Sequence, residues 1–181
     1  MKGLRSSEGY WIDEQYFAVA EEIIAVTQAS HMLEIGFNIG YSATAWLSTN
    51  INSLYIIDIG KHKDTRKALK SVKEHFSNKS VEWTLADSMS EKAKEIDLQV
   101  DLAFIDGAHS EKAVISDTKL CISKGAKWLV FDDLKEGLVV SNTIKNKIPS
   151  NVLEEIKTWE VSYRGHTNKV GLFRVRDSGY V

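Results

Sequence analysis

Short apolar runs alternate with amphipathic segments along most of this chain of 181 residues. The runs expected to form strands are His31–Ile35, Ser53–Ile59, Val81–Leu85, Asp101–Ile105 and Trp128–Phe131. Between them lie segments with helical patterns, namely Tyr41–Leu47, Asp64–Phe76, Ser90–Ile96 and Lys112–Cys121. Continuous apolar strands that alternate with helices are typical of a parallel sheet buried on both faces. The pattern therefore predicts an α/β protein with helices on both faces of the sheet.

The two ends of the chain depart from this alternation. Ser7–Ala29 has apolar residues at helical spacing, which predicts an N-terminal helical extension over residues 1–30. Val152–Ile156 is interpreted as a short helix, and Trp159–Tyr163 and Val170–Val175 as two strands joined by the turn-rich segment Arg164–Lys169. We therefore expect one domain over residues 1–181, with a seven-stranded, mostly parallel sheet that ends in an antiparallel C-terminal hairpin.

Charge and composition narrow the classes of partner. The net charge is −2, so the chain lacks the basic surface with which proteins bind nucleic acid, and no nucleic-acid partner is expected. No apolar run approaches the roughly 20 residues of a membrane span, so no membrane association is expected. The single cysteine, Cys121, has no partner for an internal disulfide, which favours a cytoplasmic location. We expect a small-molecule substrate.

The segment Leu33–Ser42 contains the pattern Glu-Ile-Gly-Phe-Asn-Ile-Gly between an expected strand and an expected helix. Open α/β sheets bind ligands at this kind of position. Gly36 is expected to let the chain turn tightly, and Gly40 to bring the backbone close to a ligand. Phe37 stands where a binder of pyrophosphate needs glycine, which disfavours a dinucleotide site. The alternative is a glycine turn without a binding role.

Two acidic positions follow later strands. Asp58 ends the second expected strand, close to the offset at which an acidic residue binds the ribose hydroxyls of a nucleotide. Its alternative role is that of a solvated strand end. Asp87 and Ser88 follow the third strand, where a carboxylate can accept the amine of an adenine. The pair is equally suited to cap the helix that begins before Glu91.

The segment Asp101–Ser110 ends the fourth expected strand with Asp106, and His109 follows three residues later. A histidine titrates near neutral pH, so His109 is suited to remove a proton from a hydroxyl nucleophile. The alternative is a surface histidine that caps the next helix. Asp106 and His109 are the catalytic candidates.

Asp132 and Asp133 end the fifth expected strand, beside Asp106 at the end of the fourth. Three carboxylates at one sheet edge repel each other unless a cation joins them. Oxygen ligands favour Mg²⁺ or Ca²⁺ over zinc. Asp106, Asp132 and Asp133 are therefore the predicted metal ligands. In the alternative, one of these residues faces solvent or caps a helix, and no metal binds.

These motifs together resemble the class I S-adenosylmethionine-dependent methyltransferases, and the resemblance extends from about Met32 to Asp133. The run Ile105–Ser110 is similar to a small group with the motif Ile-Asp-Gly-x-His-Ser. The resemblance implies a Rossmann-like fold. It further implies that Glu34, Gly36 and Gly40 surround the methionine part of the cofactor, that Asp58 binds the ribose, and that Asp87 and Ser88 contact the adenine.

Metal-dependent O-methyltransferases in this class hold Mg²⁺ with an Asp after the fourth strand and an acidic pair after the fifth. The resemblance thus implies O-methylation of a small-molecule hydroxyl, assisted by Mg²⁺. The full set expected to bind the cofactor is Glu34, Gly36, Phe37, Asn38, Gly40, Tyr41, Ser42, Asp58, Ile59, Asp87, Ser88, Asp106 and His109.

Two other functions share these features. One is a protein that binds S-adenosylmethionine without transferring the methyl group, and the other is a nicotinamide-dependent enzyme of the same fold. No segment between Gly137 and Asn151 indicates an acceptor pocket. Trp11, Tyr16 and Trp46 could line one, although core packing is favoured for each. A homodimer is expected as a way to close the site of so short a chain.

Overall fold

The computed structural model describes residues 14–163 and 166–181. The helices are α1 (Glu14–Thr27), α2 (Tyr41–Leu47), α3 (Thr65–His75), α4 (Glu91–Lys94), α5 (Glu111–Ser123) and α6 (Val139–Lys147). The strands are β1 (His31–Ile35), β2 (Ser53–Asp58), β3 (Ser80–Leu85), β4 (Leu102–Ile105), β5 (Trp128–Phe131), β6 (Leu153–Tyr163) and β7 (His166–Val175). None of the helices in these residues is long and apolar enough to cross a membrane.

All seven strands form one sheet in the order β3-β2-β1-β4-β5-β7-β6. The first five strands pair in parallel, as their continuous apolar runs predicted. β7 then inserts between β5 and β6 and pairs antiparallel with both. This arrangement confirms the predicted seven-stranded, mostly parallel sheet with an antiparallel C-terminal hairpin. The strand order reverses between β1 and β4, so the carboxyl ends of these two strands form the crevice where ligands bind in open sheets.

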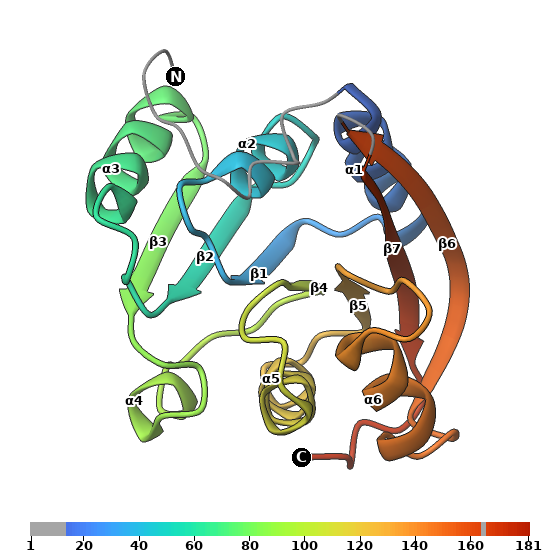
Figure 1. Cartoon of the computed structure of the whole chain (residues 1–181). Helices are drawn as coiled ribbons and strands as arrows, with labels where there is room; N and C mark the ends of the chain where they lie inside the picture. Colours follow the sequence, from blue (N-terminus) through green and yellow to red (C-terminus); the bar gives the residue numbers. More distant parts are fainter. Residues whose placement is uncertain (1–13, 164–165) are drawn as a thin grey trace.

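Helices cover both faces of the sheet, with α1, α2 and α3 on one side and α4, α5 and α6 on the other (Figure 1). Successive residues of each strand point to opposite faces, so each strand supplies both cores. In β1, Met32 belongs to the core under the first three helices, whereas Leu33 belongs to the opposite core. Tyr16 and Trp46 are almost fully buried in the first core, as core packing predicted, and Trp11 lies outside the described residues.

The structure differs from the sequence interpretation at the C-terminal end. Val152–Ile156, interpreted as a short helix, instead contains the start of β6 and a register irregularity between Glu155 and Lys157. β7 begins at His166, so residues 166–169 of the predicted turn-rich segment Arg164–Lys169 form strand, and residues 164–165 lie outside the described residues. Helix α6 was not predicted, because its N-cap is Leu138, which forms no side-chain capping bond. The predicted helix Ser7–Ala29 is observed over Glu14–Thr27, and Ser7–Asp13 lie outside the described residues.

Candidate functional site

Gly36 and Gly40 shape the loop that joins β1 to α2. Gly36 has a φ of +91°, and a Cβ there would lie 2.0 Å from the backbone oxygen of Asp106, so only glycine fits. Gly40 has a φ of +85°, and a Cβ there would lie 2.6 Å from the ring of Phe37. The tight turn at Gly36 is confirmed. At Gly40 the sequence predicted a close approach of the backbone to a ligand. The structure instead shows the buried ring of Phe37 as the close neighbour of Gly40.

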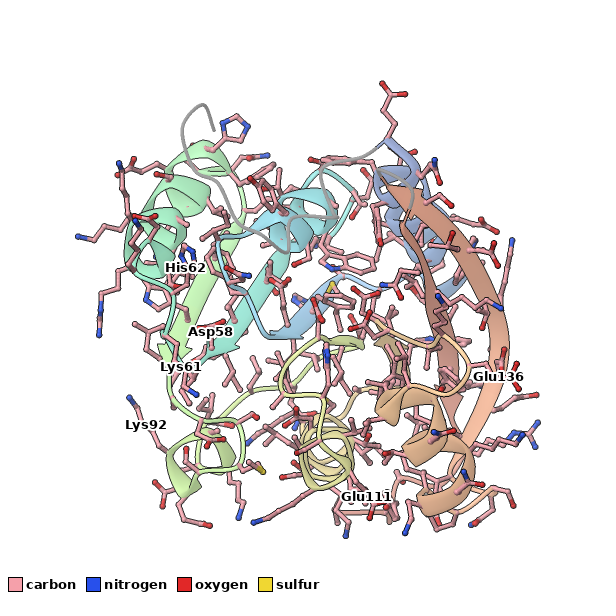
Figure 2. All side chains as sticks on the ribbon, viewed as in Figure 1. Asp58, Lys61, His62, Lys92, Glu111 and Glu136 are labelled. Carbon is pink, nitrogen blue, oxygen red and sulfur yellow. The ribbon has the colours of Figure 1, made fainter. Side chains whose placement is uncertain are left out.

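The carboxylate of Asp58 organises this loop from the end of β2. Its Oδ2 accepts hydrogen bonds from the backbone N–H groups of Phe37, at 2.8 Å, and Asn38, at 3.0 Å. Its Oδ1 accepts the N–H of Gly60. Figure 2 shows Asp58 where β2 ends, with Lys61 and His62 in the segment that follows. Asp58 is therefore more than a solvated strand end, because it holds two loops of the crevice together.

Glu34 is fully buried below the same loop. Its Oε1 accepts the hydroxyl of Ser42, whereas its Oε2 has no hydrogen-bond partner among the described residues. Burial, followed by the negative fields of Asp106 and Asp58, raises the pKa of Glu34 to about 8, against the opposing effect of Ser42. A buried acidic oxygen thus lies below the loop, where a cationic hydrogen-bond donor would satisfy it.

The predicted adenine side of the crevice is formed by the segment after β3. Asp87 is exposed, and its Oδ1 accepts the N–H of Met89 at 2.9 Å. The N-cap of α4 is Ser90, whose hydroxyl accepts the N–H of Ala93. The alternative in which Asp87 or Ser88 caps this helix is therefore wrong.

The remaining predicted cofactor residues lie around the same loops. Ile59 follows β2 with 51% of its surface exposed, a high value for an apolar side chain beside a crevice. Tyr41 is partly buried and packs against the first core. Asn38 has a φ of +52°, and its carbonyl accepts the hydroxyl of Thr65 at 2.7 Å. The ring of Phe37 is buried, so its contact with a cofactor would come from the backbone.

Asp106, His109 and Asp133 come together at the carboxyl ends of β4 and β5. The Nε2 of His109 lies 3.4 Å from Oδ1 of Asp106, and its Nδ1 lies 3.1 Å from Oδ2 of Asp133. One ligand atom from each residue lies within 4.8 Å of the other two. We call these three residues the acidic site. The N-cap of α5 is Ser110, so the alternative in which His109 caps this helix is wrong.

The charge of the acidic site acts on His109. A hydrogen bond with Asp106 and the negative fields of Asp106, Asp133 and Asp132 raise the pKa of His109, although partial burial opposes them. The imidazole is therefore a better proton acceptor than an isolated histidine. The carboxylates of Asp106 and Asp133 also supply oxygen donors that suit a divalent cation such as Mg²⁺ or Mn²⁺.

Asp132 was predicted as a metal ligand together with Asp106 and Asp133. The structure places it in a different environment, because it is 6% exposed and its Oδ1 accepts the side-chain amide of Asn168 at 2.7 Å. The described group of candidate ligands contains His109 in its place. Asn168 was not predicted as a site residue, and Tyr16, which is hydrogen-bonded to Asn168, was considered only as a residue that could line an acceptor pocket. No short motif marks either residue, because they come from β7 and α1.

Comparison with known proteins assigns a family to this arrangement. A family model described as a methyltransferase domain matches residues 33–134, which contain the loop Gly36–Gly40 and the acidic site. The chain belongs to this methyltransferase domain family. The match covers more than half of the chain, and it goes against the nicotinamide alternative. A search of curated proteins finds no significant match.

Solved structures show that the methyltransferase has the class I fold. The cofactor-bound protein Rv0187 from MTB is 14% identical with a TM-score of 0.72, and the match covers 92% of this chain and 82% of that one. An O-methyltransferase from Bacillus cereus in complex with SAH is 12% identical, with a TM-score of 0.65 and coverage of 90% and 82%. An rRNA methylase from Streptococcus thermophilus is 6% identical, with a TM-score of 0.64 and coverage of 88% and 95%. These similar structures are named for different acceptors, so the fold does not identify the substrate, which has to be inferred from the site.

The residues of the crevice fit S-adenosylmethionine on their own chemistry. The buried and unpartnered Oε2 of Glu34 would accept an N–H of the cofactor's ammonium group. Each carboxylate oxygen has two lone pairs, so Oδ1 of Asp58 retains capacity for a ribose hydroxyl beside the N–H of Gly60. The acidic site likewise fits a divalent cation, because Asp106 and Asp133 supply oxygen donors within reach of each other.

Proposed function

We propose that this methyltransferase uses S-adenosylmethionine to methylate a hydroxyl group of a small molecule, with a divalent cation held at the acidic site. One observation carries the proposal: the loop Gly36–Gly40 between β1 and α2, which we call the donor loop, is in direct contact with the acidic site, since Gly36 packs against the backbone oxygen of Asp106. A methyl donor in the loop would therefore lie beside His109 and its carboxylates. The SAH complex of the Bacillus cereus O-methyltransferase, which has the same fold, supports this choice of donor.

The donor side of the proposal assigns one role to each residue. Glu34 accepts the ammonium group of the methionine part, and Asp58 accepts the ribose hydroxyls while it holds the loop backbone at Phe37 and Asn38. Asp87 and Ser88 contact the adenine. These residues contribute mainly orientation, because the sulfonium of the cofactor is already a reactive methyl donor.

The acceptor side assigns proton transfer to His109. A divalent cation bound to Asp106 and Asp133, with Asp132 as a further candidate ligand, would lower the pKa of the acceptor hydroxyl. His109 takes the hydroxyl proton at a ring nitrogen, and its neighbouring carboxylates stabilise the imidazolium that forms. The acceptor oxygen forms a bond to the methyl carbon as the carbon–sulfur bond breaks and its electron pair stays on sulfur.

The test measures S-adenosylhomocysteine, the product of methyl transfer, by mass spectrometry, with the purified chain, S-adenosylmethionine and a panel of phenolic, catechol and sugar hydroxyl acceptors. Excess chelator is expected to suppress turnover without releasing the cofactor. Calorimetry measures the affinity for the cofactor. Asp133→Asn is expected to impair metal dependence more than cofactor affinity. Cofactor binding without product on any acceptor would favour the binding protein that transfers no methyl group.

Substitution of the base completes the test. His109→Ala is expected to lower kcat by roughly 10²–10⁴, the usual contribution of a general base. His75→Ala, at the exposed end of α3, is the matched control and is expected to leave kcat unchanged. Full activity in excess chelator together with an active His109→Ala enzyme would establish metal-free transfer by proximity and would refute the proposed mechanism.

A further inference from the structure

Asn168 connects the C-terminal hairpin to the end of β5. It lies on β7, and its Oδ1 accepts the N–H of Lys169 at 2.8 Å. This bond directs the amide nitrogen the other way, toward Oδ1 of Asp132 at 2.7 Å. Next to this contact, the backbone N–H of Leu134 donates to the carbonyl of Lys169 at 2.9 Å. The segment that follows β5 is therefore held to β7 by a side-chain hydrogen bond at Asp132 and a backbone hydrogen bond at Leu134.

Asp132 passes this restraint on to Asp133. The same Oδ1 that accepts Asn168 also accepts the backbone N–H of Asp133 at 3.0 Å. Asp133 has a φ of +58°, in the left-handed region that residues other than glycine adopt only at a cost. Such a conformation persists when its surroundings hold it in place. The two hydrogen bonds at Asp132 hold the backbone at this turn.

The turn determines where the Asp133 carboxylate lies. From the left-handed position, Oδ2 of Asp133 reaches Nδ1 of His109 at 3.1 Å. An extended backbone at the same residue would direct the side chain elsewhere. The phenol of Tyr16 supports Asn168 from α1. It is almost fully buried, it is hydrogen-bonded to the Asn168 side chain, and it lies in the fields of Asp132, Asp106 and Asp133.

We propose that Asn168 is a positioning residue for the acidic site, which through Asp132 holds the left-handed turn that directs Asp133 to His109. The effect of Asn168 on catalysis rests on the proposed function, whereas its effect on the backbone at Asp133 does not. Asn168 itself touches none of the three residues of the acidic site in the contacts described above. It acts on them through one shared acceptor oxygen.

The experiment compares crystal structures of the wild-type chain, Asn168→Ala and Asn168→Ser. Thr167→Ala is the matched control, since Thr167 is the exposed neighbour on the same strand and contacts Ser162 across the hairpin. In both Asn168 variants we expect Asp133 to leave the left-handed region and its carboxylate to separate from Nδ1 of His109 by more than about 4 Å, beyond hydrogen-bond reach. The serine variant keeps the test available if the alanine variant fails to fold.

Two solution measurements accompany the structures. We expect the Kd for Mn²⁺, measured by electron paramagnetic resonance without cofactor, to rise at least about tenfold in the Asn168 variants. The calorimetric Kd for S-adenosylmethionine is expected to stay within about twofold, because Glu34 and Asp58 lie on other elements. A general loss of structure would weaken both, so the split distinguishes positioning from folding.

The φ of Asp133 and its distance from His109 in the variant structures decide whether Asn168 positions the acidic site. If Asp133 keeps its left-handed φ and its contact with His109 in the folded variants, Asn168 does not position the site. If the wild type binds no Mn²⁺, the metal-assisted function fails, and the Asp133–His109 separation still tests the role of Asn168. The two failures are therefore distinguishable.

Discussion

Replacing Glu34 with glutamine tests the electrostatics of the donor loop. Burial raises the pKa of Glu34 from 4.5 to about 8, so the folded protein holds this carboxyl protonated at neutral pH. The unfolded chain ionises the same group above its ordinary pKa. Between these two values the unfolded state binds fewer protons, and the free energy of unfolding must therefore fall as the pH rises. The fall levels off above the folded-state pKa.

The size of the effect follows from the shift. Each pKa unit corresponds to about 1.4 kcal/mol, so the full shift is worth about 5 kcal/mol, of which about 3 kcal/mol is already expressed at pH 7. Between pH 5 and pH 7 the wild type should lose about 2–3 kcal/mol relative to Glu34→Gln. Glutamine has no ionised form, and its amide can still accept the Ser42 hydroxyl. Its unsatisfied donors add an offset that does not depend on pH.

Urea unfolding of both proteins at several pH values from 5 to 8 measures this difference. Asp117, whose pKa burial raises to about 6, is present in both proteins and cancels in the comparison. At pH 7, binding of S-adenosylmethionine is also expected to release about one proton in the wild type and none in Glu34→Gln, because the ammonium group stabilises the carboxylate. Calorimetry in buffers of different ionisation enthalpy counts this proton. Parallel stability curves for the two proteins would refute the reasoning.

Three further outcomes are expected. Asp58→Ala should weaken cofactor binding by about 1.5–3 kcal/mol, the range for charge-assisted hydrogen bonds, and calorimetric affinity within twofold of wild type would limit Asp58 to supporting the loop. Gly36→Ala should lower the free energy of unfolding in urea by more than about 3 kcal/mol, since its Cβ would collide with backbone atoms. The control Gly137→Ala, with a similar φ of +85° and no described atom within 4 Å, should lower it by about 1–2 kcal/mol. Equal losses for the two variants would show that the collision at Gly36 is relieved. Sedimentation of the chain with cofactor should show a homodimer, and a monomer at high concentration would exclude it.

The parallel half of the sheet was predictable because its strands are buried on both faces. β1, α2 and β5 have the predicted bounds. The short, largely apolar runs of β1 and β5 are typical of strands that are buried on both faces of a parallel sheet. The antiparallel end was harder to predict. Val152–Ile156 places apolar residues four apart, which fits a helix, yet from Leu153 onward the segment belongs to the edge strand β6, where Glu155 and Ile156 are exposed.

The candidate site divides in the same way. Glu34, Gly36 and Asp106 could be found from their positions at strand ends, because parallel strands bring their carboxyl ends to one edge. The roles of Phe37 and Asn168 could not be found in this way. The Phe37 ring is directed into the core by packing against Gly40, and Asn168 reaches Asp132 only because β7 inserts beside β5. Both outcomes depend on tertiary packing, which periodicity along the chain does not reveal.

The insertion of β7 between β5 and β6 bears on the order in which the protein is completed during synthesis. β1 to β5 pair with each other, so the donor loop can assemble as soon as β5 has left the ribosome. Asp132 has its partner only after β7 has been made and has added to the sheet beside β5. A nascent chain released before residue 168 would therefore hold the donor loop without the anchored turn at Asp133. If the proposed function is right, we expect the ability to bind the methyl donor to precede the ability to transfer the methyl group.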